Sequence, residues 1–548
     1  MSALVLEPTC LKEVLTQTAL LYPTSESYVG PDGRRTWRET LERSTRVAKA
    51  LLALGVNKGD HVGILLGNCS QWIEIFFGCA LIGAVTVPIN TRFKKNELEY
   101  CLKQSNVKVL FFVERFLNID FEAMLKELEP ALEEVLPGQV LPSLLHCIST
   151  AGTIGLEGVM GLDDFMGLAN SLAQSVFEAK SEMVTPHDVL LIQFTSGTTS
   201  FPKGVMLTHS NMLLNARAVA SRMRVSSEDR YFSIRPYFHV AGSTLSILVS
   251  LNTGCCLLTL PKFDVKENLK VLFEEKCTLI SGNDTIFLSL IGDESFDVKR
   301  LYLTGGWAAV DPGVMQKIHD EMGIKTICNA YGQSEASPNV LFSSCDEPFE
   351  LRKSGFATPL PGVQVRLADP LTDEAVCIHE TGEIQVKGWN VMKGYYNMPK
   401  ETAKAFTKDG WLKTGDLGEY DQEQRVRMVG RLKDIFRVGG ENVAPSDVEE
   451  VLHAHPAVQQ AQVVGVPDQR LGEVCAAFVI SNGSQAVSVE DLVMWCKERC
   501  ANFKVPKYLA FVESFEHIGM TGSSKVQKNK LREHAIELWQ LSPKTTVN

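Results

Sequence analysis

The stretch VLLIQFTSGTTSFPKG, residues 189–204, joins a short apolar run to a loop rich in hydroxyl side chains. Residues Val189–Phe194 have the length and the composition of a buried β-strand. The ten residues that follow contain five hydroxyl side chains, two glycines and Lys203. Such a loop can hold a polyanion, because hydroxyls and exposed amides donate hydrogen bonds to phosphate oxygens while the lysine adds a positive charge. The spacing is not that of a Walker P-loop, and a loop of this composition standing alone is more often only a loop.

The same alternation of strand and helix continues on the N-terminal side of this stretch. Residues His61–Leu66, Ala84–Pro88 and Val107–Val113 are further short apolar runs that predict buried strands. Residues Arg38–Leu54 and Lys94–Gln104 have the length and the amphipathic pattern of helices. This β-α-β rhythm predicts an α/β protein whose sheets are mostly parallel.

Two uncharged stretches are long enough to be tested as membrane spans. Ile75–Ile89 is too short to cross a bilayer and contains two glycines and a proline. Val240–Pro261 has sufficient length but is interrupted by the polar turn at residues 252–254. We expect each stretch to be a buried helix that leads into a buried strand, and no integral membrane segment. The N-terminus lacks the basic and apolar regions of a secretory signal.

A change of pattern near Arg431 predicts a domain boundary. Upstream, Thr381–Asp421 is rich in glycine and strand-like, whereas downstream a compact α/β pattern begins, with strands expected at Ala461–Val466 and Cys475–Ile480. The chain of 548 residues is long enough for several domain-sized units. The predicted division is an N-terminal domain of residues 1–430 and a C-terminal domain of residues 431–548.

Two helix starts are expected inside the C-terminal domain. Ser446 is followed three residues later by Glu449, which is the pattern of a capping box. Ser488 and Asp491 repeat this pattern at the start of a second helix, which is expected to run through Cys500.

Charge and cysteine content limit the class of protein. The chain has 54 basic and 65 acidic side chains, a net charge of −11 and a pI near 5.6, which argues against general binding of nucleic acid. The 14 cysteines are scattered and contain no C-x-x-C pair, so a zinc ribbon is not expected. Reduced thiols in the core of a cytoplasmic protein are the expected state.

The loop at residues 195–204 resembles the signature T-S-G-T-T-G-x-P-K-G of the adenylate-forming superfamily, which includes acyl-CoA synthetases, nonribosomal adenylation domains and beetle luciferases. This sequence departs from the signature at Ser200, which replaces a glycine. The resemblance implies that the loop binds ATP and that Thr198 contributes to a Mg²⁺ site. The loop residues implied in ATP binding are Thr195, Ser196, Gly197, Thr198, Thr199 and Lys203.

Residues 329–335 resemble the Y-G-x-T-E motif of the same superfamily. By that resemblance Tyr331 stacks on adenine, while Glu335 holds Mg²⁺ and takes part in catalysis. The chemistry agrees, because an aromatic face suits a purine and a carboxylate suits a Mg²⁺ ion that also bridges phosphates. Further residues expected beside the nucleotide are Gly305, Gly306, Gly332, Gln333 and Ser334.

Two more segments resemble the parts of the superfamily that lie next to the domain boundary. Residues 411–416 resemble W-x-x-T-G-D, which implies that Asp416 accepts hydrogen bonds from the ribose hydroxyls. Residues 430–434 resemble the interdomain hinge, which implies that Arg431 contacts ribose or phosphate and that Lys433 is the hinge residue. Residues 438–442 resemble the loop beside the pantetheine arm of CoA; the residues implied there are Gly439, Gly440 and Glu441. A hairpin turn would also explain this pair of glycines.

Residues 522–528 resemble the P-x-x-x-G-K motif that carries the superfamily's catalytic lysine, and Lys525 aligns with that lysine. A cation at this position can bridge the acid's carboxylate and the α-phosphate while charge develops on phosphorus. The match is imperfect, since Ser524 replaces the usual glycine. Lys528 and Lys530 are expected to be solvated.

Residues 235–239 resemble the L-P-x-F-H segment beside the acyl pocket of the superfamily, with His239 as an aromatic gate close to the α-phosphate. Domains that activate amino acids carry an aspartate where this chain has His239, so an α-amino acid substrate is not expected. Trp307 stands where relatives have a small residue, which favours a compact acid. The residues expected to line the pocket are Phe238, Ala241, Gly242, Trp307, Ala308 and Ser337.

Together, the resemblance implies an α/β fold with a large N-terminal domain of mostly parallel sheets flanked by helices, a distorted barrel, and a small mobile α/β C-terminal domain. It implies an ATP-dependent carboxylic acid–CoA ligase that uses Mg²⁺ and coenzyme A and forms an acyl-adenylate. The expected substrate is a short-to-medium, branched, cyclic or aromatic acid. A catalytically altered nucleotide-binding relative and a ligase for a longer fatty acid remain open, and assembly as a homodimer is compatible with the sequence.

Overall fold

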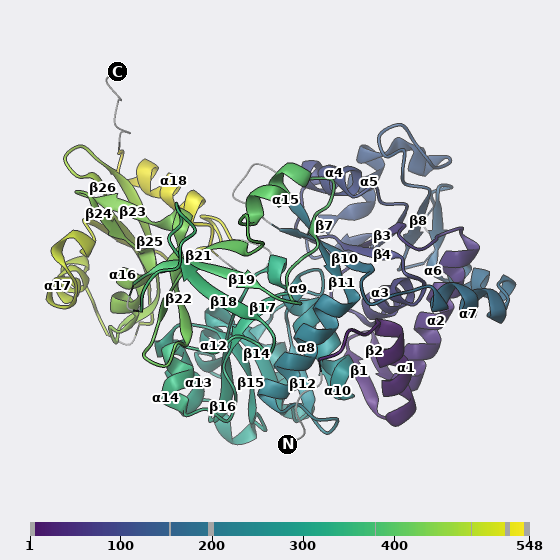
Figure 1. Cartoon of the computed structure of the whole chain (residues 1–548), viewed down its shortest axis with the longest axis horizontal. Helices are drawn as coiled ribbons and strands as arrows, with labels where there is room; N and C mark the ends of the chain where they lie inside the picture. The colour runs from purple at the N-terminus through teal and green to yellow at the C-terminus, as the bar shows by residue number, and fades with distance from the viewer. Residues whose placement is uncertain are drawn as a thin grey trace.

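Large, mostly parallel sheets organise the N-terminal part of the chain, and a smaller α/β unit follows at the C-terminal end (Figure 1). The computed structural model describes residues 6–152, 155–195, 202–378, 380–483, 485–520 and 526–541. Apolar strand residues cover both faces of the parallel sheets, as expected where helices pack on each side.

The first sheet has the strand order β20-β11-β10-β4-β3-β5-β8-β9 and is parallel from β10 to β9. Its strands are β3 (His61–Leu65), β4 (Val85–Pro88), β5 (Val109–Phe112), β8 (His146–Ser149), β9 (Val159–Gly161), β10 (Val189–Thr195), β11 (Lys203–Thr208) and β20 (Gly394–Tyr395). The strands predicted from apolar runs are confirmed. Strand β11 was not predicted: it pairs antiparallel with β10, so the two strands form a hairpin around the hydroxyl-rich loop.

The second sheet has the order β17-β16-β15-β14-β12-β13-β1-β2 and is parallel from β16 to β1. Its strands are β1 (Glu26–Gly30), β2 (Gly33–Thr36), β12 (Arg230–Ser233), β13 (Cys256–Leu258), β14 (Leu279–Asn283), β15 (Gly305–Ala309), β16 (Thr326–Gly332) and β17 (Asn339–Phe342). Antiparallel strands close both edges. A small hairpin elsewhere contains β6 (Arg115–Phe116) and β7 (Ile119–Asp120).

Helices pack between and around these sheets, and one continuous core includes side chains from both sheets and from α1, α2, α3, α8 and α10. The helices of this part are α1 (Leu11–Leu21), α2 (Trp37–Ala53), α3 (Ser70–Ile82), α4 (Lys95–Gln104), α5 (Phe121–Leu128), α6 (Leu162–Leu168), α7 (Gln174–Glu182), α8 (His209–Met223), α9 (Val240–Gly242), the π-helix η3 (Ser243–Leu248), α10 (Val249–Thr253), α11 (Val265–Glu274), α12 (Asp284–Ile291), α13 (Pro312–Asp320), α14 (Phe349–Ser354) and α15 (Pro399–Ala405), with short 3₁₀ turns η1 (Pro130–Glu133), η2 (Ala169–Ser171), η4 (Val298–Arg300) and η5 (Ser334–Ala336).

The two uncharged stretches are buried helices that lead into strands, as predicted. Helix α3 runs into β4, and the continuous helical segment of α9, η3 and α10 runs into β13. Among the residues that the structure describes, no helix is both long enough and apolar enough to cross a bilayer.

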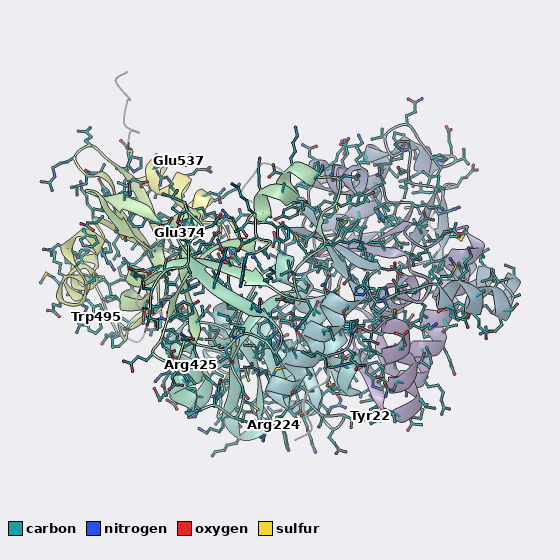
Figure 2. The ribbon with its side chains drawn as sticks, in the orientation of Figure 1. Tyr22, Arg224, Glu374, Arg425, Trp495 and Glu537 are labelled. Carbon is teal, nitrogen blue, oxygen red and sulfur yellow. The ribbon has the colours of Figure 1, made fainter. Side chains whose placement is uncertain are left out.

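A third, antiparallel sheet with the order β18-β19-β21-β22 lies between the parallel sheets and the C-terminal unit (Figure 1). Its strands are β18 (Gln364–Ala368), β19 (Gly382–Lys387), β21 (Leu412–Tyr420) and β22 (Val426–Arg431). The resemblance implied a distorted barrel in addition to the parallel sheets, and the structure has this four-stranded antiparallel sheet beside them. Arg425, labelled in Figure 2, forms an ion pair with Asp421 at 2.6 Å in the hairpin that joins β21 to β22.

The C-terminal unit has its own apolar core, centred on β25 and β26. Its strands are β23 (Phe436–Val438), β24 (Glu441–Val443), β25 (Val458–Asp468), β26 (Gly472–Ser481) and β27 (Tyr508–Phe511), and its helical elements are η6 (Leu432–Asp434), α16 (Pro445–His453), α17 (Val489–Arg499), η7 (Asn502–Lys504) and α18 (Lys528–Leu538). The strands predicted at 461–466 and 475–480 lie within β25 and β26. The chain passes from the third sheet to this unit through residues 432–435.

One of the two predicted helix starts is correct. Ser488 is the N-cap of α17 and forms the reciprocal pair of hydrogen bonds with Asp491. The prediction for Ser446 is wrong, because the N-cap of α16 is Ala444, two residues earlier, and the helix begins at Pro445. Proline favours the first helical position, where its missing N–H has no partner to lose. The hydroxyl of Ser446 instead donates a hydrogen bond to the carbonyl of Val429 in β22.

Candidate active site

A buried chain of polar contacts links the end of β16 to the third sheet. The Tyr331 hydroxyl donates a hydrogen bond to Asp416 Oδ2 at 2.9 Å, and Arg431 Nε lies 3.3 Å from Asp416 Oδ1. Asp416 and Arg431 face each other as a cross-strand pair of β21 and β22. Asp416 is only 5% exposed, and burial raises the pKa of Tyr331 well above its ordinary value. Three residues predicted to bind the nucleoside therefore lie together, although 85 positions separate Tyr331 from Asp416.

A second cluster surrounds Glu335. The Tyr395 hydroxyl donates to Glu335 Oε1 at 2.9 Å, and Lys203 Nζ lies 4.9 Å from the centroid of the Tyr395 ring. Lys203 also forms an ion pair with Glu401 at 3.4 Å. Burial raises the pKa of Glu335, and the positive charge of Lys203 opposes that shift. The cluster thus holds a desolvated carboxylate beside a cation, an arrangement that suits a metal ion and phosphates.

The hydroxyl-rich loop and the catalytic-lysine segment are only partly described. Thr195 ends β10 and pairs with Lys203, the first residue of β11. Ser196, Gly197, Thr198, Thr199 and Lys525 lie outside the described residues. Lys528, expected to be solvated, is in fact half-buried and forms an ion pair with Glu449.

Residues 235–242 form a turn that leads from β12 into α9. His239 is the N-cap of α9 and accepts a hydrogen bond from the Ala241 amide at Nδ1, at 3.1 Å. The carbonyl of Phe238 accepts a hydrogen bond from Gln193 of β10 at 3.0 Å. The predicted pocket residues Phe238, Ala241 and Gly242 are therefore held next to the strand that carries the hydroxyl-rich loop.

Trp307 lies on β15 and is 3% exposed. Its indole Nε1 donates a hydrogen bond to the Tyr231 hydroxyl at 2.8 Å, and that hydroxyl donates in turn to the Leu245 carbonyl of η3 at 3.1 Å. The indole therefore reaches across β14 towards β12 and fills space between the sheet and η3. Ala308, the next residue, points to the opposite face of the sheet, because successive side chains of a strand alternate.

For most of the other residues predicted near the nucleotide, the structure shows where the backbone lies. A Cβ atom on Gly306 would lie 1.8 Å from the Ile280 carbonyl oxygen, so close packing of neighbouring strands requires a glycine there. The backbone N–H of Gln333 donates a hydrogen bond to the backbone carbonyl of Pro338 at 2.9 Å. Ser337 is buried, and its hydroxyl donates a hydrogen bond to the Asn390 carbonyl at 2.7 Å. This bond ties η5 and the segment after it to the loop that contains Asn390. Gly305 is the first residue of β15, Gly332 is the last residue of β16, and Ser334 begins η5.

The hinge and the glycine pair lie on the C-terminal side of β22. Lys433 is exposed in η6, and partial desolvation of its ammonium group lowers its pKa. Gly439 and Gly440 have φ values of 61° and 99° and form the turn between β23 and β24, so the hairpin interpretation is correct. Glu441 is exposed at the start of β24.

Sequence reasoning missed several contacts of the site. Tyr395 and Glu401 belong to no motif that the spacing singles out, yet both contact the cluster of Lys203 and Glu335. His453 of α16 forms an ion pair with Asp311 of the large domain at 2.8 Å, which connects the two domains in the conformation described. Each partner is distant in the sequence, so a single sequence carries no signal that joins it to the motif.

The Asp416→Ala variant is expected to weaken ATP binding. The carboxylate contacts Tyr331 and Arg431 in a buried position, and loss of a charged hydrogen-bond acceptor costs about 1.5–3 kcal/mol. The measurement is the KM for ATP, with binding of ATP by calorimetry. Glu419→Ala is the matched control, because Glu419 lies on the same strand and pairs with Arg427 at 2.6 Å. An unchanged KM for ATP in Asp416→Ala would contradict the assignment.

These contacts are compatible with the adenylate-forming ligases that the sequence motifs resemble. The comparisons with known proteins agree. Residues 15–396 match the family described as AMP-binding enzyme, and residues 447–525 match the AMP-binding enzyme C-terminal domain. The chain belongs to the AMP-binding enzyme family.

Relatives of similar length match nearly the whole chain. The chain is 38% identical to a putative acyl-CoA synthetase, YngI, of Bacillus subtilis (strain 168), covering 96% of this chain and 97% of that protein. It is 32% identical to the mitochondrial medium-chain acyl-CoA ligase ACSF2 of Rattus norvegicus, covering 95% and 86%. The crystal structure of the anthranilate CoA ligase AuaEII with anthranoyl-AMP superposes with a TM-score of 0.86 at 23% identity, covering 98% and 99%.

These findings confirm the predicted superfamily, the fold class and the enzyme class. The chain is an AMP-forming acid–thiol ligase that acts on a carboxylic acid with ATP and CoA.

Proposed function

We propose that this protein converts a compact carboxylic acid, short to medium in length and branched, cyclic or aromatic, first to its acyl-adenylate and then to its CoA thioester. The observation that supports a compact acid is the Trp307 indole, which is buried and fills space between β15 and η3. A long acyl tail would need that volume. The name of the rat relative points to a medium-chain acid, and a ligase for a longer fatty acid is the alternative.

The nucleotide is assigned to the chain of Tyr331, Asp416 and Arg431, and its phosphates to the hairpin loop that ends at Lys203. Mg²⁺ would be held by Glu335 together with Thr198. Thr198 lies outside the described residues. The fit is supported by Glu335, a half-buried carboxylate that accepts a hydrogen bond from the Tyr395 hydroxyl at 2.9 Å. Mg²⁺ commonly binds one or two carboxylates and completes its coordination with substrate phosphates and water, so a full protein cage is not required. The ion would neutralise charge on the departing pyrophosphate.

Different residues of the chain would act in adenylation, in binding of the acid and in thioester formation. Lys525 would stabilise charge on the α-phosphate during adenylation, and His239 would close the acyl pocket beside the reacting carboxylate. The turn of Gly439 and Gly440, followed by Glu441, would approach the CoA arm after the small domain rotates about Lys433. Residence in the cytoplasm and assembly as a homodimer stay predictions from the sequence.

Release of pyrophosphate, measured with a panel of acids in the presence and absence of CoA, tests this proposal. Release that depends on the acid, with acyl-CoA formed when CoA is added, is the expected result. Binding of ATP without pyrophosphate release from any acid would favour the second candidate, a catalytically altered nucleotide-binding relative. The departure at Ser200 is the observation that keeps this candidate open.

Lys433→Pro is expected to separate the two half-reactions. Lys433 lies inside a 3₁₀ turn, where φ is near the value of about −65° that proline imposes, so the substitution should hold the conformation described here. The variant should then keep the half-reaction that this conformation catalyses and lose the other one. If this conformation is the adenylating one, adenylation is kept and thioester formation is lost. The measurement is pyrophosphate release with and without CoA, and thioester formation from supplied acyl-adenylate.

Lys433→Ala is the control for this variant, because it removes the same side chain and leaves φ free to change. Normal rates of both half-reactions in Lys433→Pro would remove the hinge assignment. Equal losses in the alanine variant would show that the side chain, not rotation, is required.

A further inference from the structure

Arg235 is a buried arginine whose guanidinium has no hydrogen-bond acceptor among the described residues. The residue is 8% exposed, and its guanidinium carbon lies 5.2 Å from the centroid of the Trp307 indole. Its Nε is buried without a hydrogen-bond partner, and within the described residues neither of its other guanidinium nitrogens has a hydrogen bond or an ion pair. Burial lowers the pKa of Arg235 to about 10, so the side chain is still charged at neutral pH.

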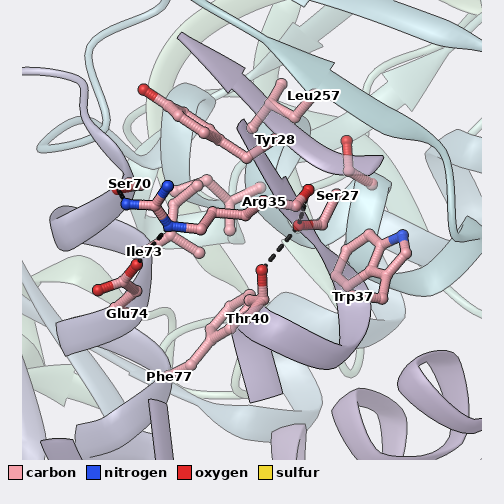
Figure 3. A pocket seen from close by; sticks show the side chains of 12 residues that line it. Ser27, Tyr28, Arg35, Trp37, Thr40, Ser70, Ile73, Glu74, Phe77 and Leu257 are labelled. Atoms are coloured by element: carbon pink, nitrogen blue, oxygen red, sulfur yellow. Dashed lines mark hydrogen bonds and ion pairs between the residues drawn. The ribbon is translucent and has the colours of Figure 1, made fainter. Parts of the chain in front are cut away.

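Other arginines that are buried or half-buried in this protein have hydrogen-bond acceptors supplied by the fold. Arg222 donates to the Phe342 and Pro359 carbonyls at 2.7 and 3.0 Å, and Arg352 donates to the Lys325 carbonyl at 2.7 Å. In the pocket of Figure 3, Arg35 donates to Glu74 at 3.2 Å and to Ser70 at 3.1 Å, so the charged groups there neutralise each other. An unpaired buried cation reduces stability, which makes Arg235 an exception that folding does not explain.

The surroundings of Arg235 are those of a ligand site. Arg235 follows the carboxyl end of β12, the edge of a parallel sheet where ligands of open α/β proteins bind. Serine hydroxyls line the face of this sheet that packs against η3. The Ser281 hydroxyl donates a hydrogen bond to the Ser233 hydroxyl at 3.0 Å, and the hydroxyls of Ser233 and Ser246 share a hydrogen bond of 2.7 Å. The segment of Phe238 and His239 begins three residues later. A guanidinium and a row of hydroxyls are poor neighbours for an alkyl tail.

We propose that the acid activated by this protein carries a second carboxylate, and that Arg235 binds it while the first carboxylate is adenylated. This inference rests on the proposed function and narrows its substrate to compact dicarboxylic acids. The planar guanidinium, fixed against the indole, can donate two parallel hydrogen bonds to a carboxylate. The segment L-P-x-F-H that residues 235–239 resemble has leucine at this position, so the arginine is a feature of this chain.

Two other anions are weaker candidates for Arg235. The nucleotide cluster of Tyr331 lies at the end of β16, three strands from β12, which corresponds to about 14 Å across the sheet. The carboxylate of Asp284 acts on Arg235 from outside ion-pair distance and already accepts the Asp311 amide at 3.1 Å, and burial raises its pKa. The acyl side of the site is therefore the remaining source of a counter-ion.

The test compares acids of equal carbon number that differ only in the distal group: succinate with butyrate, glutarate with pentanoate, and adipate with hexanoate. For each acid, kcat/KM of thioester formation and the dissociation constant by calorimetry are measured in the wild type, Arg235→Met and Arg235→Lys. Arg217→Met is the control variant, because Arg217 is a half-buried arginine whose Nε donates a hydrogen bond to Asn252 of α10. Melting temperatures are recorded for all variants.

The wild type is expected to prefer one diacid over its matched monoacid by about 100-fold, and Arg235→Met to lose that preference while the KM for ATP is unchanged. Arg235→Lys should retain part of it. The melting temperature of Arg235→Met should equal or exceed that of the wild type, because an unpaired charge is removed.

Equal use of monoacids and diacids, unaffected by Arg235→Met, would overturn the inference and leave the ligase assignment intact. A raised KM for ATP with unchanged acid preference would assign Arg235 to the nucleotide and also overturn it. If no acid yields a thioester, calorimetry decides: diacid binding that depends on Arg235 supports the inference while the proposed function fails, and its absence overturns the inference.

Discussion

The Lys525→Ala variant is expected to lose most of its adenylation rate. A cation that stabilises charge on the reacting phosphorus typically contributes about 2.7–4 kcal/mol, which corresponds to a loss of roughly 10²–10³ in rate. Thioester formation from a supplied acyl-adenylate should change far less, because the phosphorus no longer reacts in that step. The measurement is single-turnover kinetics of each half-reaction.

Neighbouring lysines provide the control for this prediction. Lys530 is exposed on α18, so Lys530→Ala should leave both half-reactions unchanged. Lys528 is not a suitable control, because its ion pair with Glu449 supports the packing of α18 on α16. Equal losses in both half-reactions of Lys525→Ala would show that this lysine has a different role.

The parallel sheets could be predicted because their strands are buried on both faces. An apolar run such as that of β3 or β5 is therefore visible in the sequence without knowledge of its neighbours. Strand β11 escaped prediction because it begins inside the glycine-containing loop and ends at Thr208, the N-cap of α8. Its identity as a strand depends on pairing with β10, which local composition does not encode.

The site shows the same division between local and distant information. Residues such as Tyr331, Asp416 and Arg431 could be proposed one by one from short motifs, but their hydrogen bond and ion pair depend on the packing of β16 against the third sheet. Tyr395 could not be proposed, because its contact with Glu335 spans 60 positions. Arg235 is the first residue of the segment that resembles L-P-x-F-H, but the sequence does not show that its side chain is buried. Only the structure shows that its Nε is buried without a hydrogen-bond partner among the described residues.

The Trp307→Gly variant is expected to have the largest effect on stability. The indole is buried against Tyr231 and η3, and loss of a buried tryptophan costs about 3–5 kcal/mol. The Tyr231 hydroxyl loses its donor but keeps its hydrogen bond to the Leu245 carbonyl. Thermal and denaturant unfolding measure this loss. Phe287→Ala is a control of similar size, because Phe287 is fully buried on the opposite face of the same sheet.

Substrate preference should change in Trp307→Gly and stay unchanged in Phe287→Ala. Each methylene newly buried in the opened pocket is worth about 0.8 kcal/mol, so acids longer by several carbons should gain about one to two orders of magnitude in relative kcat/KM. Collapse of neighbouring side chains into the emptied volume would reduce the gain. Preference across a series of chain length and branching, not absolute rate, is therefore the measurement, and an unchanged ranking would show that Trp307 does not set the size of the pocket.

The same substitution also bears on Arg235, whose guanidinium lies against the indole. If Trp307 holds Arg235 in position, Trp307→Gly should reduce the preference for diacids as well as admit longer acids. The double variant with Arg235→Met should then lose little more diacid preference than either single variant, because residues that act together are not additive. Additive losses would mean that the indole limits chain length and the guanidinium selects charge independently. A loss of diacid preference only in Arg235→Met would restrict Trp307 to setting the volume of the pocket.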